Sequence, residues 1–419
     1  MYGFYMISRK TDNLGLRALI GSSAAILWPG ALTFGFPGVM APHWQEMFHV
    51  GKGAIGNTLF FMLAALGVFM FFVGRWQERF GIRRMMTIGS VLFGANILII
   101  TFATNLPMLY LWAFLNGTAT CFIYTPALTT VQRWYPDRRG LVSGVVNFAF
   151  GISAAVMSPL FHRMIESMGY VAMNLTVAAM ALATGIVAAR FTEGPQQHAS
   201  HSPDPATPRA GTGINLDNSL TVRESLATRS FWFLWLTWAF QGAASISMIT
   251  LSIAFGLSRG YSMEAAVAIL TAFNLLNGGS RIVMGYLSDV MNRNLAMSLT
   301  FLAAGGAYLF LPHVSGVIIT ALLAAIVGFS LGTLFAVSAP LAADCFGMRH
   351  FGAIFGLVYT AYGFVAGPLG PSLSGYLLDM TAGNFTIVFS YLGIFCIVSG
   401  GFIRFVVPPP LRGRATQLP

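Results

Sequence analysis

Residues 74–84 read GRWQERFGIRR, and residues 285–293 read GYLSDVMNR. Each stretch closes an apolar run that is long enough to cross a lipid bilayer as a helix. Their first glycines are 211 residues apart, and the same distance separates the acidic residues Glu78 and Asp289. The same loop pattern at equivalent places in two parts of one chain indicates an internal duplication.

A second set of residues keeps nearly the same spacing, with an offset of 212 residues. The matching pairs are Gly140 and Gly352, Gly144 and Gly356, Gly151 and Gly363, and Pro159 and Pro371. Several matches in one register predict two related halves, which is the plan of transporters built from parallel repeats. The Gly-x-x-x-Gly pattern is typical of close helix packing, so we expect Gly144 and Gly356 to contact neighbouring helices rather than a substrate.

The composition indicates the class of protein. Of the 419 residues, 56% are hydrophobic and only 9% are charged, whereas about 25% are charged in an ordinary soluble domain. So few charges could not cover soluble cores, and we expect a membrane protein with several crossings. The cysteines Cys121, Cys345 and Cys396 are too scattered for a disulfide framework or a zinc site, so we expect no metal and no cofactor. The net charge of +10 is attributed to topology rather than to a nucleic-acid partner.

Twelve apolar runs are long enough to cross a bilayer, and all should be helices because lipid offers no partner for open backbone groups. The expected spans are residues 16–42, 52–74, 84–104, 106–132, 140–163, 168–190, 230–258, 263–286, 294–312, 314–340, 351–378 and 385–407. Twelve crossings put both termini on one side, where 19 Lys and Arg residues lie against three on the other. This bias predicts cytoplasmic termini and a plasma or inner membrane location.

The halves are expected at residues 1–190 and 230–419, each a six-helix bundle in an all-α membrane protein. The cytoplasmic connection, residues 191–229, opens with a Pro- and Ser-rich stretch that is typical of a flexible linker. Near its end, Thr221 and Glu224 have the spacing of a capping box, which favours a short helix there. A chance match within a coil remains open.

The stretch GRWQERFGIRR resembles the loop signature of the major facilitator superfamily, which usually carries Asp where this chain has Glu78. The resemblance implies two pseudo-symmetric bundles and cytoplasmic loops that act as conformational latches. The residues it assigns to the latch are Glu78, Arg79, Arg83, Asp289 and Arg293. Tyr124-Thr-Pro126 and the stretch QRWYPDRRG at residues 132–140 resemble the branch of monocarboxylate transporters and oxalate/formate antiporters.

The chain departs from that branch at three places. Members often carry an Asp–Arg pair one turn apart on the eighth helix, whereas here the pair is Asn277 and Arg281. Some carry Lys after a Phe-Pro in the first helix, where this chain has Gly38. The oxalate exchanger resemblance would require Lys in the eleventh helix, and residues 351–378 contain none. These departures argue against a dicarboxylate and leave the proton-carrying group open.

Arg281 is the ionisable residue that lies deepest in the expected spans. All thirteen acidic residues and all seven His residues fall in expected loops or away from span centres. Arg281 precedes Asp289 by eight residues, about 12 Å along a helix, which places it near the bilayer midplane. A buried Arg there is costly, and its planar fork fits a carboxylate, so we expect an anion receptor. A structural Arg that bonds helix-end carbonyls is the alternative.

Other candidates for the substrate site share this depth or face. Asn277 lies one turn from Arg281 and could orient the guanidinium, bind substrate or bond another helix. The remaining polar candidates are Tyr124, Asn147, Tyr359 and Tyr362, each of which could instead be a packing residue. Phe34 and Phe335 are candidates for an apolar wall around a short alkyl body.

These observations predict a monomeric secondary transporter of a small monocarboxylate, such as lactate or pyruvate, that works by alternating access. The resemblance to monocarboxylate transporters favours proton symport, whereas Asn277 in place of Asp favours exchange. An oxalate/formate type of exchanger and a non-transporting receptor on the same fold are the alternatives. No enzyme is expected, because the G-x-S-x-G match at residues 328–332 lies inside an apolar span without a nearby His or acid.

Overall fold

The computed structural model describes residues 2–135, 139–192, 219–347 and 350–409. Eleven helices in this part of the chain are long and apolar enough to cross a membrane. One of them is two helices joined at Gly169, whose φ of +79° breaks the helical path. The described residues therefore contain twelve crossings, as the sequence predicts, and the first and last of these crossings begin and end on one side, called here the termini side.

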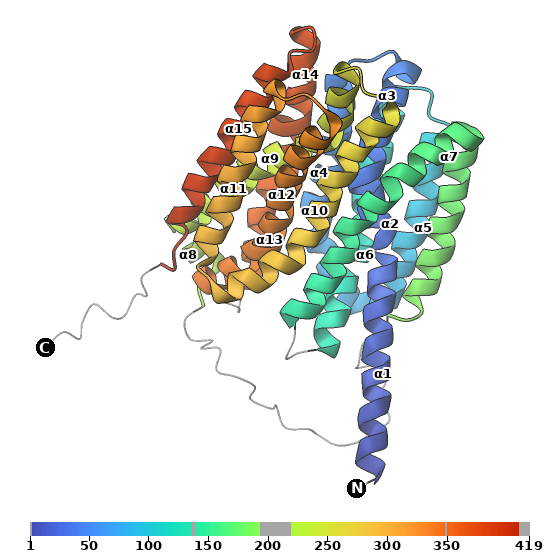
Figure 1. Cartoon of the computed structure of the whole chain (residues 1–419). Coiled ribbons are helices and arrows are strands. Elements are labelled where there is room, and N and C mark those ends of the chain that lie inside the picture. Colours follow the sequence, from blue (N-terminus) through green and yellow to red (C-terminus); the bar gives the residue numbers. More distant parts are fainter. Residues whose placement is uncertain (1, 136–138, 193–218, 348–349, 410–419) are drawn as a thin grey trace, which may run out of the picture.

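The helices of the first half are α1 (Tyr2–Ala25), α2 (Leu27–Gly30), η1 (Ala31–Gly35), α3 (Phe36–Phe48), α4 (Lys52–Phe80), α5 (Ile82–Thr101), α6 (Leu106–Trp134) and α7 (Arg139–Ala189). Helix α1 starts well before the expected first span, and its first turns extend away from the bundle (Figure 1).

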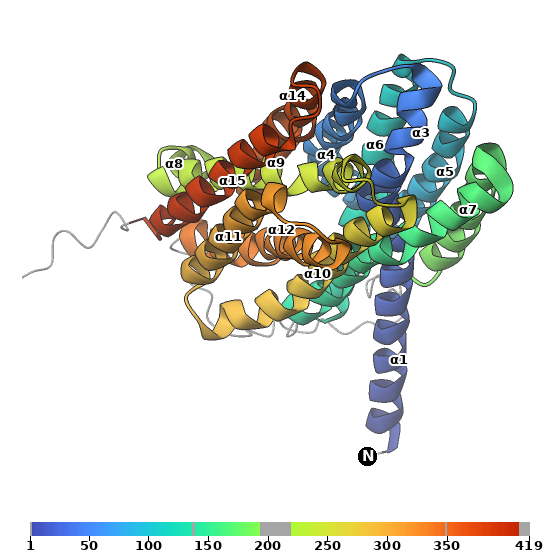
Figure 2. The ribbon, with the colours of Figure 1, turned by 45° about the horizontal axis from the view of Figure 1, so that its top comes forward.

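After the connection follow α8 (Val222–Leu226), α9 (Arg229–Ser258), α10 (Met263–Val290), α11 (Arg293–Phe310), η6 (Leu311–His313), α12 (Val317–Phe346), α13 (Phe351–Ala361), η7 (Tyr362–Ala366), η8 (Pro368–Ser372), α14 (Leu373–Met380), α15 (Phe385–Phe402) and η9 (Ile403–Phe405). In Figure 2 the blue-to-green helices and the orange-to-red helices gather on opposite sides of the molecule, with α4 and α10 between them.

The first and eleventh crossings are not continuous α-helices. Each contains π-helical turns, η1 in the first crossing and η7 and η8 in the eleventh. Pro37 and Pro371 lie at these places, and a proline has no N–H to donate to the carbonyl four residues earlier. Wider turns of this kind often occur at functional sites, and η1 and η7 carry Phe34 and Tyr362.

Packing within the two halves repeats in the same register as the sequence. A side chain at Gly117 would collide with the carbonyl of Met62, and one at Gly328 would collide with that of Phe273. Both the glycines and their partners are 211 residues apart. The same helix contact in both halves confirms the pseudo-symmetric fold that the spacing predicts.

The contacts between the halves are related in the same way. A Cβ at Gly151 in α7 would lie 2.6 Å from the Cα of Gly278 in α10. A Cβ at Gly363 in η7 would lie 3.2 Å from the Cα of Gly67 in α4. The second pair is the pseudo-symmetric copy of the first. Gly363 lies 212 residues after Gly151, and Gly278 lies 211 residues after Gly67. The halves thus meet at two equivalent glycine crossings.

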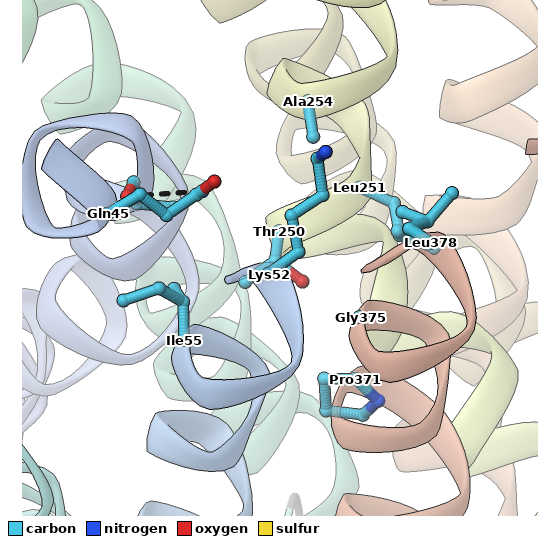
Figure 3. A pocket seen from close by; sticks show the side chains of 10 residues that line it. Gln45, Lys52, Ile55, Thr250, Leu251, Ala254, Pro371, Gly375 and Leu378 are labelled. Carbon is cyan, nitrogen blue, oxygen red and sulfur yellow. Dashed lines mark hydrogen bonds between the residues drawn. The ribbon is translucent and has the colours of Figure 1, made fainter. Parts of the chain in front are cut away.

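The halves are also joined at the face opposite the termini. The carboxylate of Asp379, at the end of α14, accepts hydrogen bonds from the backbone N–H groups of Lys52 (2.9 Å) and Gly53 (2.8 Å), at the start of α4. An anionic carboxylate is favourable at a helix N-terminus. Beside this contact, Figure 3 shows a small pocket lined from both halves, for example by Gln45, Thr250 and Leu378.

The termini side differs. A Cβ at Gly144 or Gly356 would meet nothing within 4 Å, and the same is true of Gly74 and Gly285. The expectation that the Gly-x-x-x-Gly motifs pack against neighbouring helices is therefore wrong for Gly144 and Gly356, whereas Gly140 and Gly352 lie outside the described side chains. The physical reason is that α4, α7, α10 and α13 come together at the glycine crossings and separate toward the termini.

The capping box is confirmed. The N–H of Glu224 donates to Oγ1 of Thr221 (3.3 Å), the N–H of Thr221 donates to Oε2 of Glu224 (2.8 Å), and the short helix α8 follows. Residues 193–218 of the connection lie outside the described part.

Of the latch residues, the side chains of Glu78 and Asp289 lie outside the described part. Arg79 stacks on Phe80, and Arg83 lies in the first turn of α5. Arg293 forms an ion pair with Asp344 of α12. This ion pair joins two helices of the same half.

Candidate functional site

Arg281 lies on α10 beside the glycine crossing of α7 and α10, and its side chain is 2% exposed. Its Nη2 donates to Oδ1 of Asn277 (3.3 Å), one turn earlier on the same helix. Its Nη1 donates to the backbone carbonyl of Asn147 (3.3 Å), on α7 of the other half. The same Nη1 lies 3.5 Å from Oδ1 of the Asn147 side chain. Arg281 therefore connects the two halves beside the glycine crossing.

Three phenyl rings surround the guanidinium. Its central carbon lies 4.7 Å from the ring centre of Phe335, 5.5 Å from that of Phe150 and 6.0 Å from that of Phe34. Each contact of this kind contributes about 0.5–2 kcal/mol, more when water is excluded. Among the described residues Arg281 forms no ion pair, so the rings and neutral oxygens are all that offsets the burial of its charge.

Asn147 is held in place by Tyr124 of α6. The Tyr124 hydroxyl donates to Oδ1 of Asn147 (2.6 Å), so that this oxygen faces two donors, Tyr124 and Arg281. The Tyr124 ring also packs edge-on against Phe150, at 5.3 Å between ring centres. The sequence analysis missed Phe150, although it lies three residues after Asn147 and so shares its helix face.

The residues around Arg281 come in pseudo-equivalent pairs. The pairs are Tyr124 and Phe335, Asn147 and Tyr359, and Phe150 and Tyr362, with offsets of 211, 212 and 212 residues. The position equivalent to Arg281 itself is Met70. The fold therefore provides a nearly symmetric ring of aromatic and amide groups, and the second half alone supplies a charge.

Several buried donors at this site have no hydrogen-bond partner among the described residues. They are Nε of Arg281, Nδ2 of Asn277 and the hydroxyl of Tyr362. An unpaired buried donor costs about 1–3 kcal/mol, so such a cluster is unfavourable when empty. A bound acceptor such as a carboxylate would satisfy these donors.

A further aromatic residue, Trp238 of α9, packs against three of these residues. Its ring centre is 4.6 Å from that of Tyr359, 5.2 Å from Phe335 and 5.5 Å from Tyr362. The sequence analysis missed it. Counting residues from the end of the span could have identified Trp238. It is nine residues from Arg229, just as Tyr124 is nine residues from Arg133, which places both at the same depth.

The structure thus brings together all eight residues proposed from the sequence for the substrate site, namely Phe34, Tyr124, Asn147, Asn277, Arg281, Phe335, Tyr359 and Tyr362. They come from the first, fourth, fifth, eighth, tenth and eleventh crossings. Trp238 adds the seventh crossing to this list.

Comparison with known proteins identifies the family. The model of the Major Facilitator Superfamily matches residues 23–368 and 269–419. The chain belongs to this superfamily. It is therefore a membrane transporter and not an enzyme, and the G-x-S-x-G match lies inside α12, where Oγ of Ser330 donates to the carbonyl of Val327 (2.7 Å).

Curated relatives are distant. The chain is 24% identical over 290 residues to the oxalate:formate antiporter of Oxalobacter formigenes, covering 69% of this chain and 67% of that protein. It is 28% identical over 351 residues to human monocarboxylate transporter 11, covering 80% and 70%. These are the two kinds of transporter in the branch that the sequence motifs resemble.

Among solved structures, the fold is similar to that of a bacterial homologue of the human lysosomal transporter Spinster, in an inward-facing and unoccupied conformation. The TM-score is 0.68 at 14% identity, over 94% of this chain and 95% of that one. This likeness concerns the fold alone.

Proposed function

We propose that the protein is a secondary active transporter of small monocarboxylates, and that Arg281 binds the substrate carboxylate. The observation that carries this proposal is a fully buried Arg281 whose Nε is unpartnered and whose only described partners are neutral. A cationic substrate would be repelled here, whereas a carboxylate would pair with the charge.

A single carboxylate suits the site better than two. Arg281 is the one charged side chain among the residues assembled here, and the rest of the wall is aromatic or amide. The second charge of a dicarboxylate would be desolvated against neutral donors alone, which is costly. The printed names of the relatives, monocarboxylate transporters and an oxalate:formate antiporter, also favour a small organic anion.

Transport proceeds by alternating access, in which residues 1–190 and 230–419 rock about the central site and residues 191–229 connect them. Two features support this. The halves touch at the face opposite the termini and at the glycine crossings, and the outer glycines on the termini side have no neighbour. The termini side is the cytoplasmic side, by the excess of Lys and Arg there.

Substrate binding permits the halves to move. When the site is empty, Arg281 of the second half is bonded to Asn147 of the first, and a carboxylate competes for that guanidinium. In symport, the proton accompanies the substrate itself, since a guanidinium is ordinarily protonated at neutral pH and the described residues assembled around Arg281 include no carboxylate. Exchange, in which only the anion-loaded protein reorients, is the alternative.

The test is counterflow of labelled lactate in proteoliposomes. R281A should abolish saturable uptake, and R281K should impair it strongly because an ammonium cannot replace the bidentate fork. R259K is the matched control. Arg259 lies away from Arg281, at the face of the molecule opposite the termini, where it stacks on Phe255. Uptake of oxalate far above that of lactate would replace this proposal with the exchanger. Binding without counterflow would indicate a receptor.

A further inference from the structure

We propose that the indole N–H of Trp238 is a specificity-determining donor that recognises an oxygen on carbon 2 of the bound monocarboxylate. This inference rests on the proposed function, because it requires the carboxylate to lie at Arg281. It makes the preferred substrates 2-hydroxy and 2-oxo acids, rather than unsubstituted acids of the same length.

The position of Trp238 supports this role. The side chain is fully buried, and its Nε1 has no hydrogen-bond partner among the described residues. By contrast, Nε1 of Trp28 donates to Thr184 (2.7 Å) and Nε1 of Trp44 donates to Tyr170 (3.1 Å). Buried indole N–H groups normally find such a partner, so the open donor of Trp238 needs an explanation.

Trp238 and Arg281 share one neighbouring residue. The ring of Phe335 contacts both groups, with the guanidinium of Arg281 4.7 Å from its centre and the ring of Trp238 5.2 Å from it. Trp238 and Arg281 therefore contact the same phenyl ring. A molecule that extends from Arg281 along this ring would meet the indole.

A second open donor lies beside the first. The Tyr362 ring packs edge-on against Trp238 and is buried against Gly242 of α9, where a side chain would collide with it. The Tyr362 hydroxyl is buried and unpartnered. The indole only donates, whereas the hydroxyl donates or accepts, so the pair can bond a keto oxygen or a hydroxyl group.

The chemistry explains discrimination. A substrate with an oxygen on carbon 2 satisfies a buried donor, whereas one with hydrogen there leaves the donor unpaired after expelling water. A site built to bond a substrate hydroxyl rejects the analogue without it more strongly than an apolar pocket rejects a missing methylene. Lactate and propionate, which differ only in this hydroxyl, are therefore the informative pair.

The experiment measures the affinities of lactate, pyruvate and propionate for the reconstituted full chain and for W238F. This substitution keeps an aromatic ring and removes the N–H. The unmodified protein should prefer lactate over propionate, and W238F should lower that preference about tenfold, mainly by weakening lactate. Any general loss from repacking affects both acids and cancels in the ratio.

W112F is the matched control. Trp112 of α6 is also fully buried with an unpartnered Nε1, but it packs against Phe36 and Trp44, away from the rings around Arg281. It should leave the ratio unchanged. If W238F does not fold, Y362F tests the neighbouring donor by the same ratio.

The outcomes are distinct. An unchanged lactate-to-propionate ratio in W238F, or in Y362F if that variant has to be used, assigns these residues to packing and overturns the proposal. A protein that binds the acids equally well overturns it too. If the unmodified protein binds none of the three acids, the proposed function itself fails and the assignment of Trp238 fails with it.

Discussion

Arg281 carries a charge that the rest of the site leaves unbalanced. Asn147, Asn277 and three phenyl rings surround it, and each of these groups is neutral. These neutral groups stabilise the buried guanidinium without forming a permanent ion pair with it. Under the proposed function, a substrate carboxylate replaces Asn147 as the hydrogen-bond partner of Arg281, and we expect the free-energy change of this replacement to be small enough for the substrate to be released.

Converting Asn147 to Asp should block the site. The new carboxylate would lie beside Arg281, where Oδ1 already faces the guanidinium at 3.5 Å, and would form an internal ion pair. We expect N147D to lower lactate affinity by roughly tenfold or more and to raise the melting temperature, because the buried charge gains a permanent partner. N147D is checked by binding and thermal unfolding of the purified protein.

Replacement of Asn147 by Gln, which keeps the amide, is the control and should retain more affinity than N147D. Equal affinity in N147D and the unmodified protein would mean that the substrate carboxylate does not use Arg281.

At the scale of helices, each of the four crossings that meet at the glycine contacts carries a second glycine seven residues from the first. Gly151 and Gly278 touch at one crossing, and two turns further toward the termini lie Gly144 and Gly285. Seven residues are nearly two full turns, so the outer glycine faces the same side as the inner one. The other crossing has the same arrangement. Gly363 and Gly67 touch there, and Gly356 and Gly74 lie two turns further toward the termini.

We therefore predict that Gly144 meets Gly285, and Gly74 meets Gly356, when the termini side closes. Cysteines at these places should fit the present conformation, since an added Cβ meets nothing within 4 Å. The pairs G144C/G285C and G74C/G356C should crosslink during lactate turnover and then stop transport. The mismatched pair G144C/G356C is the control.

Crosslinking of the mismatched pair as fast as the matched pairs would contradict this closing geometry. The three native cysteines are buried, so they should interfere little. The latch role of Glu78 and Asp289 belongs to the same closing movement and stays a prediction.

At the scale of the whole molecule, the net charge moved in each transport cycle bears on whether transport is coupled to protons. A monocarboxylate that moves with one proton transfers no net charge, and we expect symport on this ground. An inward pH gradient should drive accumulation of labelled lactate into proteoliposomes without internal substrate, and a protonophore should abolish it. Uptake that requires internal counter-substrate and ignores the gradient would establish exchange.

Much of the fold could be predicted from the sequence. The apolar runs, the offset of 211–212 residues and the basic loop at residues 74–84 specify twelve crossings in two related bundles. Hydrocarbon is a uniform solvent that demands long apolar helices, so length and polarity alone reveal each crossing. The depth of Arg281 also follows from counting residues to the nearest span end.

Other features depended on the tertiary structure. Which residues share a depth can be counted, but which of them face one another depends on helix rotation and on the close approach at Gly151 and Gly278. Packing therefore decided that Phe150 and Trp238 join the site, and that Asn147 bonds Arg281 across the two halves. Packing also left Gly144 without a neighbour, because α7 and α10 touch at Gly151 and Gly278 and separate toward the termini.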